Sequence, residues 1–163
     1  MANTLVAYFS LTGHTRRVAE KLARITGADL VEIKPAVPYT KEDLDWTNPE
    51  SRSSIEKTNE ATRPAMAQPI DTTGYSTVFI GYPLWWETAP RIIRTFLESQ
   101  DFEGVHVANF VTSSSSTRGS DGHRLHRSAP NALWHKGRRF TETNTEEDLR
   151  DWLDEMTPEL PLD

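Results

Sequence analysis

The chain has 163 residues, 36% of them hydrophobic and 26% charged, and its formal net charge at pH 7 is −6. These values are typical of a globular protein, so we expect a single domain over residues 1–163. Lys and Arg are scattered rather than clustered, which argues against a nucleic-acid partner, and the absence of cysteine excludes disulfides, thiolate metal sites and cysteine nucleophiles.

The first predicted element is a strand over residues 4–9, an apolar run of the kind that is buried on both faces of a sheet. This run is too short for a signal sequence or a membrane span, so we expect a cytoplasmic protein with no membrane partner. Apolar positions at helical spacing after Gly13 then predict a helix that ends before Gly27. A strand over residues 30–33 completes a βαβ unit, which indicates a parallel sheet.

The next segment, residues 36–69, is polar and holds four of the ten prolines. A segment this long usually has structure of its own or a function, and we expect a short helix near Thr40 and a second helical stretch near residues 51–60. A buried strand is then predicted over residues 77–82, followed by a helix that has Pro90 in its first turn.

A fourth strand is predicted over residues 105–111, followed by a weak helix over 120–128 and a short strand over 138–140. Thr145 caps the last predicted helix, which has an apolar face. Alternating strands and helices indicate an open α/β sheet, whose ligands bind beyond the carboxyl ends of the strands at a topological switch point.

Three loops lie at such strand ends: residues 10–15, 83–88 and 112–119. In the first loop, hydroxyls and backbone N–H groups converge at a helix N-terminus, where the helix dipole favours an anion. This pattern predicts a phosphate cradle without a basic side chain, and an ordinary hydroxyl-capped turn is the alternative. The Walker pattern and the dinucleotide-binding glycine pattern are both missing, which argues against nucleoside triphosphates and NAD as the resident ligand.

The second loop places Trp85 and Trp86 beside the predicted crevice, where a flat apolar ligand would find aromatic walls. The alternative is that either tryptophan packs beneath the loop. The third loop is rich in serine, but no G-x-S-x-G pattern surrounds it, so a serine hydrolase is not favoured. Its hydroxyls and backbone donors are expected to bind ligand oxygens, with a solvated turn as the alternative.

Several segments resemble the short flavodoxin-like proteins that bind FMN: Y-F-S-L-T-G-H-T-R-R-V-A-E-K-L-A, G-Y-P-L-W-W-E-T-A-P-R-I-I-R-T-F-L-E-S and the Thr-Ser-rich third loop. The segments P-Y-T-K-E-D-L and S-R-S-S-I-E are similar to that group as well, so the resemblance covers nearly the whole chain. It implies a flavodoxin-like doubly wound α/β fold with a five-stranded parallel sheet of order 2-1-3-4-5 and helices on both faces.

The resemblance also implies that FMN binds non-covalently, with its phosphate on the first loop and its isoalloxazine ring against the other two. It implies no catalytic residue and no metal. Three departures from the family pattern stand out, since His14 replaces the usual Asn, Glu87 replaces a frequent Gly, and two serines of the third loop replace common glycines. The implied contact residues are Ser10, Thr12, Gly13, His14, Thr15, Pro83, Leu84, Trp85, Trp86, Thr112, Ser113, Ser114 and Ser115.

Electron transfer to or from a redox partner protein is the leading functional hypothesis, because the cofactor supplies the chemistry. The acidic chain favours a reductase or acceptor with a basic surface. The close alternative is an NAD(P)H-dependent FMN oxidoreductase that reduces a quinone or a similar acceptor, and the sequence does not separate the two. A flavin-free signalling module on this fold would need acidic residues where the chain has Phe9, Ser10, Tyr82 and Pro83.

Overall fold

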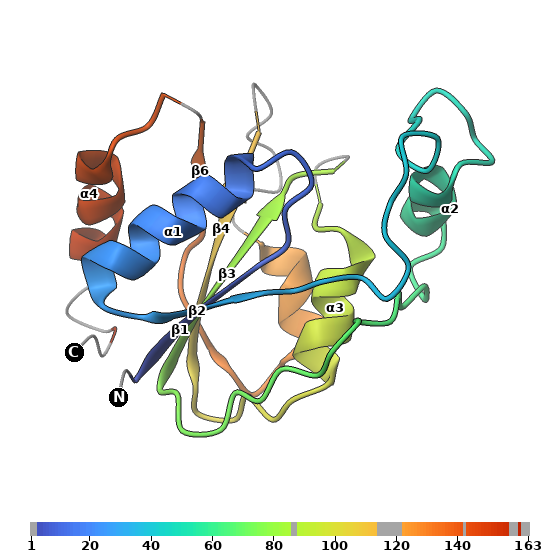
Figure 1. The fold of residues 1–163 in the computed structure, drawn as a ribbon. Coiled ribbons are helices and arrows are strands. Elements are labelled where there is room, and N and C mark those ends of the chain that lie inside the picture. The colour runs from blue at the N-terminus through green and yellow to red at the C-terminus, as the bar shows by residue number, and fades with distance from the viewer. Residues whose placement is uncertain (1–2, 86–87, 114–121, 142, 157–159, 161–163) are drawn as a thin grey trace.

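A computed structural model describes residues 3–85, 88–113, 122–141, 143–156 and 160 (Figure 1). Its centre is a parallel sheet in which the strands follow the order β2-β1-β3-β4-β5, as expected. The four longer strands are β1 (Thr4–Tyr8), β2 (Asp29–Glu32), β3 (Thr77–Pro83) and β4 (His106–Thr112).

Among the described residues the sheet has six strands, one more than expected, because the position beside β4 holds two short strands. β5 (Leu133–Trp134) pairs with the start of β4, and β6 (Arg138–Phe140) pairs with its end. Gly137 lies between them, where a Cβ atom would be 2.3 Å from Asn109 Oδ1 of β4. The chain therefore passes close to the buried Asn109 side chain at a point where only glycine fits.

Helices cover both faces of the sheet (Figure 1). α1 (His14–Thr26) and α4 (Glu146–Met156) lie on one face. α3 (Arg91–Glu98) and the 3-10 helix η1 (His123–Ser128) lie on the other. The predicted helices after Gly13 and after Thr145 are thus confirmed, while the expected weak helix over residues 120–128 is a 3-10 helix within its described part.

β1 is buried on both faces, as its apolar run predicts. Val6 and Tyr8 pack in the core beneath α1 and α4, whereas Leu5 and Ala7 pack in the core beneath α3. Successive side chains of a strand point to opposite faces, so a strand with apolar residues on both faces requires a layer of helices on each side. α1 is followed by Gly27, whose φ of 71° is the left-handed conformation expected for the residue after a helix.

The segment between β2 and β3 contains α2 (Arg52–Thr58), which lies in the second expected helical stretch. The helix expected near Thr40 is wrong, because this part of the chain forms consecutive turns. Thr40 N donates to Asp43 Oδ2 (2.9 Å) and Asp43 N donates to Thr40 Oγ1 (3.1 Å). Side-chain bonds of this local kind stabilise turns in competition with a helix.

We expect Gly81→Ala in β3 to lower the free energy of unfolding by about 1–3 kcal/mol, as overpacking does in a closed core. A Cβ atom at Gly81 would lie 2.1 Å from Cζ of Phe110, whose buried ring also packs against Trp152. Urea denaturation measures the change. In a Phe110→Leu background the same substitution should cost less, and an equal cost in both backgrounds would contradict the explanation.

Candidate functional site

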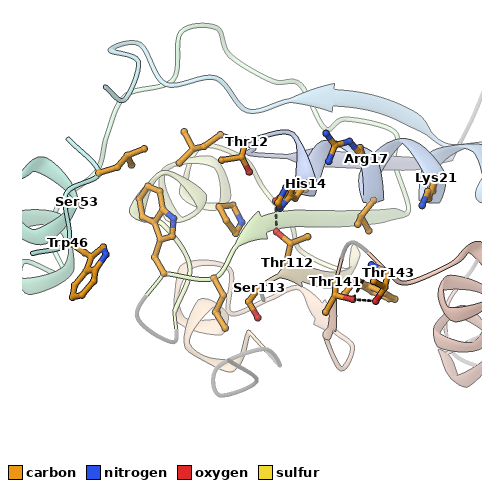
Figure 2. A pocket seen from close by; sticks show the side chains of 18 residues that line it. Thr12, His14, Arg17, Lys21, Trp46, Ser53, Thr112, Ser113, Thr141 and Thr143 are labelled. Atoms are coloured by element: carbon orange, nitrogen blue, oxygen red, sulfur yellow. Dashed lines mark hydrogen bonds between the residues drawn. The ribbon is translucent and has the colours of Figure 1, made fainter. Parts of the chain in front are cut away.

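A cavity of about 830 Å³ opens at the carboxyl ends of β1, β3 and β4 (Figure 2). This volume falls in the range of roughly 300–1,000 Å³ that is usual for small-molecule sites. Its walls come from the loop after β1, the first half of α1, the ends of β3, β4 and β6, and the segment between β2 and β3. The cavity therefore lies where an open α/β sheet is expected to bind its ligand.

Most of the contact residues expected from the sequence that the structure describes line this cavity. Ser10 and Gly13 belong to the first loop but do not line it, and Trp86, Ser114 and Ser115 lie outside the described residues. The expected residues found in the lining are Thr12, His14, Thr15, Pro83, Leu84, Trp85, Thr112 and Ser113.

The first loop is a turn held together by Ser10. Ser10 Oγ accepts hydrogen bonds from the backbone N–H groups of Gly13 (3.2 Å) and Arg16 (3.3 Å). Gly13 has a φ of 95°, which a residue with a side chain adopts only with strain, and it directly precedes α1. This turn leaves the side chains of Thr12 and His14 exposed on the wall of the cavity, at the N-terminus of α1.

Thr15 joins the first loop to the third. Its Oγ1 lies 2.7 Å from Thr112 Oγ1, and both side chains are buried (Figure 2). One hydroxyl donates to the other, so the accepting hydroxyl keeps its own proton for a further bond into the cavity. This bond fixes the start of α1 against the end of β4 and holds two walls of the cavity at a set distance.

Arg17 and Lys21 also line the cavity, which the sequence analysis did not foresee. The loop itself has no Lys or Arg, as expected from the sequence, but Arg17 of α1 lies against it, with Nη2 3.7 Å from the point where a Cβ atom on Gly13 would be. No Asp or Glu is present among the described lining residues. The spacing of four residues from Gly13 to Arg17 and on to Lys21 was the available signal, because it places all three on one helix face.

Leu44, Trp46 and Ser53 form a wall that comes from the segment between β2 and β3. Figure 2 shows Trp46 and Ser53 at one end of the cavity and Lys21 at the other. Trp46 is 73% exposed although it is a large apolar side chain. Sequence reasoning missed this wall because the segment has no hydrophobic periodicity, and the tryptophan itself was the only signal.

Trp85 lines the cavity and also packs against the core. Its ring meets Phe9 edge-on, with centroids 5.9 Å apart, and meets Tyr39 in the same manner at 5.5 Å. Its backbone N–H donates to Thr88 O, and Thr88 N–H donates back to Trp85 O, each at 2.9 Å. These contacts fix the orientation of the indole.

Tyr39 is in turn held by a charged network. Its hydroxyl donates to Glu56 Oε1 (2.7 Å), and Arg52 Nε donates to Glu56 Oε2 (3.1 Å). The Arg52 guanidinium carbon lies 3.8 Å from the centre of the Tyr39 ring, a cation–π contact. Burial of the hydroxyl and its bond to Glu56 raise the pKa of Tyr39. The wall around Trp85 is therefore supported by a network anchored on α2.

We expect Tyr39→Phe to destabilise the protein by about 1–2 kcal/mol at neutral pH, because the buried Glu56 carboxylate loses a donor. Since folding raises the pKa of Tyr39, the hydroxyl's contribution is complete below the unfolded-state pKa of about 10 and falls as the pH rises above it. The stability difference between wild type and variant, from urea denaturation, should thus be the same at about pH 8 and about pH 9 and become smaller by about pH 11. A difference that stays constant would contradict this network.

Metal binding and membrane insertion find no support in the described residues. No group of three or more described His, Cys, Asp or Glu side chains is placed to hold a metal ion. In the described part of the chain, no helix has the length and apolar character needed to cross a membrane.

A parallel sheet of order 2-1-3-4-5, with helices on both faces and a cavity at the strand ends, defines a protein of the flavodoxin-like class. The chain belongs to the flavodoxin family, which it matches over residues 3–156. No match to a curated protein was found.

Three solved structures show how far the likeness extends. A candidate flavoprotein of Bacteroides uniformis is 42% identical, with a TM-score of 0.87 over 93% of this chain and 97% of that one. A candidate flavoprotein of Bacteroides eggerthii is 43% identical, with a TM-score of 0.87 over 96% and 99% of the two chains. A flavoprotein of Lactobacillus acidophilus, solved in complex with FMN, shares the fold at 21% identity and a TM-score of 0.66, over 93% and 99%.

Proposed function

We propose that the chain binds FMN non-covalently in this cavity and acts as an electron carrier. The observation that carries the proposal is the charge of the cavity: in a chain of net charge −6, its described lining residues include Arg17 and Lys21 but no carboxylate. Such a lining favours an anionic ligand. When bound, FMN supplies the electron-transfer chemistry, while the protein binds the cofactor and orients it.

The residues of the cavity fit the two chemical halves of FMN. Thr12, His14 and the N-terminal N–H groups of α1 offer donors for the phosphate, and the Arg17 guanidinium lies against the same loop. Leu84 and Trp85 offer an apolar wall for the isoalloxazine ring. The complex of the Lactobacillus acidophilus flavoprotein with FMN supports this choice of ligand.

The redox partner of the proposed carrier is a reductase or an acceptor with a basic surface. Support comes from the acidic excess of the chain, with 24 Asp and Glu against 18 Lys and Arg. Charge of one sign on a carrier accelerates its encounter with a partner of the opposite sign. We place this exchange in the cytoplasm, on the ground that the chain uses no cysteine.

We expect Arg17→Gln to weaken FMN binding about tenfold to a hundredfold, the range for loss of a hydrogen bond to a charged group. Riboflavin, which lacks the phosphate, should bind wild type and variant equally. Calorimetric titration of the flavin-free full chain measures both ligands. Arg16→Gln is the matched control, because Arg16 faces Glu20 at 3.9 Å instead of the cavity. Equal weakening of FMN and riboflavin would contradict a phosphate contact.

An FMN-dependent oxidoreductase is the second candidate, and the exposed Trp46 favours it. A carrier that exchanges electrons at its surface does not need a large aromatic side chain at the mouth of its cavity. An enzyme that reduces a flat acceptor such as a quinone would gain from one, because the acceptor could pack against it. NAD(P)H oxidation in the steady state by the FMN-loaded protein separates the two candidates, since only the enzyme turns over.

If the protein turns over, we expect Trp46→Ala to raise KM for a quinone roughly two- to tenfold, as loss of one aromatic contact predicts. FMN affinity and the rate with a small inorganic acceptor such as ferricyanide should not change. Ile55→Ala is the control, because Ile55 is a half-exposed apolar residue of α2 outside the cavity lining. A loss of FMN affinity in Trp46→Ala would show that this tryptophan contacts the flavin itself.

A further inference from the structure

Trp85 connects the wall of the cavity to two aromatic rings in the interior. Its side chain lines the cavity, and its ring contacts the rings of Phe9 and Tyr39. The centroids of Trp85 and Tyr39 are 5.5 Å apart, and those of Phe9 and Tyr39 are 5.9 Å apart, so the three rings form one cluster. Aromatic rings in contact exchange an electron readily. The cluster therefore offers a path for an electron between the cavity and Tyr39.

Tyr39 differs from the other two rings because its ionisable proton lies next to a base. Its hydroxyl donates to Glu56 Oε1 at 2.7 Å, a distance within the range for direct proton transfer. Glu56 is 5% exposed, so bulk water is largely excluded from this carboxylate. Within the described residues, Tyr39 is the one ring of the cluster whose side chain is bonded to a carboxylate. It can thus give an electron to one neighbour and a proton to another.

Arg52 makes these two events depend on each other. Its guanidinium carbon lies 3.8 Å from the centre of the Tyr39 ring, and its Nε donates to Glu56 Oε2 at 3.1 Å. A positive charge at this distance opposes a second positive charge on the ring. Burial and the bond to Glu56 raise the pKa of Tyr39, so the proton does not leave before the electron. Tyr39 is therefore poised to lose both together.

We propose that Tyr39 is a redox-active residue that returns an electron to Trp85 after a one-electron oxidant in the cavity has oxidised this tryptophan. The oxidant is an excited flavin, so the inference rests on the proposed flavin site and extends it. Trp85 loses one electron to the oxidant and regains one from Tyr39. The O–H bond of Tyr39 breaks as its proton bonds to Glu56 Oε1, which leaves a neutral phenoxyl radical and a neutral carboxylic acid. The total charge is the same before and after this second step.

A second tyrosine–carboxylate pair provides a matched control. The hydroxyl of Tyr75 donates to Asp29 Oδ2 at 2.6 Å. Asp29 begins β2 and Tyr75 precedes β3, so the pair lies at the amino ends of these strands, whereas the cavity lies at the carboxyl ends. The seven residues of β3 span roughly 20 Å between the two places. Tyr75 thus has a base but no contact with the aromatic cluster.

Transient absorption spectroscopy of the FMN-loaded full chain after a laser flash tests this electron path. In wild type, the tryptophan radical should decay as a tyrosyl radical appears, and the decay should be slower in heavy water because a proton moves with the electron. In Tyr39→Phe, which keeps the aromatic ring, the tyrosyl signal should be lost and the tryptophan radical should persist. Glu56→Gln should also prolong the tryptophan radical, whereas Tyr75→Phe should behave as wild type. Calorimetric titration with FMN establishes that each variant retains its flavin site.

The outcomes separate this inference from the proposed function. Failure of FMN to bind wild type would overturn the flavin site and the electron path together. Normal FMN binding without a tyrosyl signal, or with a tyrosyl signal that Tyr39→Phe leaves unchanged, would overturn the electron path alone. A tyrosyl signal that depends on Tyr39 but not on heavy water or on Glu56→Gln would overturn the assignment of Glu56 as the proton acceptor.

Discussion

The pairing of β3 with both β1 and β4 is the constraint on which the whole site depends. Pro83 is opposite Thr112 in the register of β3 and β4, so these strands end together. The pairing continues past the strand ends, because Phe9 N donates to Gly81 O (2.9 Å) and Leu84 N donates to Thr112 O (3.0 Å). Loops that are far apart in sequence therefore meet at one edge of the sheet, and parallel strands make this unavoidable.

The strands and the main helices could be predicted from the sequence because burial of one or both faces of an element requires apolar residues at regular spacing. The segment that provides the cavity wall with Trp46 has no such regular spacing of apolar residues. α2 is tied to α3 by Arg91, whose Nε donates to Glu56 O (2.9 Å) and whose Nη2 donates to Lys57 O (3.0 Å). These bonds join residues more than thirty positions apart, and α2 is positioned by them rather than by its own sequence.

The first loop shows which part of a site a short motif can predict. The run from Ser10 to Thr15 marks the loop itself, since the turn needs a glycine with positive φ and a hydroxyl, that of Ser10, which accepts from Arg16 N in the first turn of the helix. The roles within the run were less predictable. Ser10 holds the turn, Thr15 bonds to Thr112 across the sheet, and Arg17, four residues after Gly13, lies against the loop. These roles depend on side-chain direction and on a partner from a distant strand.

The placement of charge explains how one acidic chain could serve both an anionic cofactor and a basic partner. Screening limits the reach of a surface charge to about 8 Å at physiological ionic strength. A ligand inside the cavity therefore responds mainly to Arg17 and Lys21, which line it, and much less to the net charge of −6 on the whole chain. A partner that approaches from solvent would instead respond to an excess of negative charge, because the acidic excess of the chain lies outside the described lining. The proposed cofactor and the proposed partner would thus respond to different charges, and the opposite signs of net charge and cavity charge do not conflict.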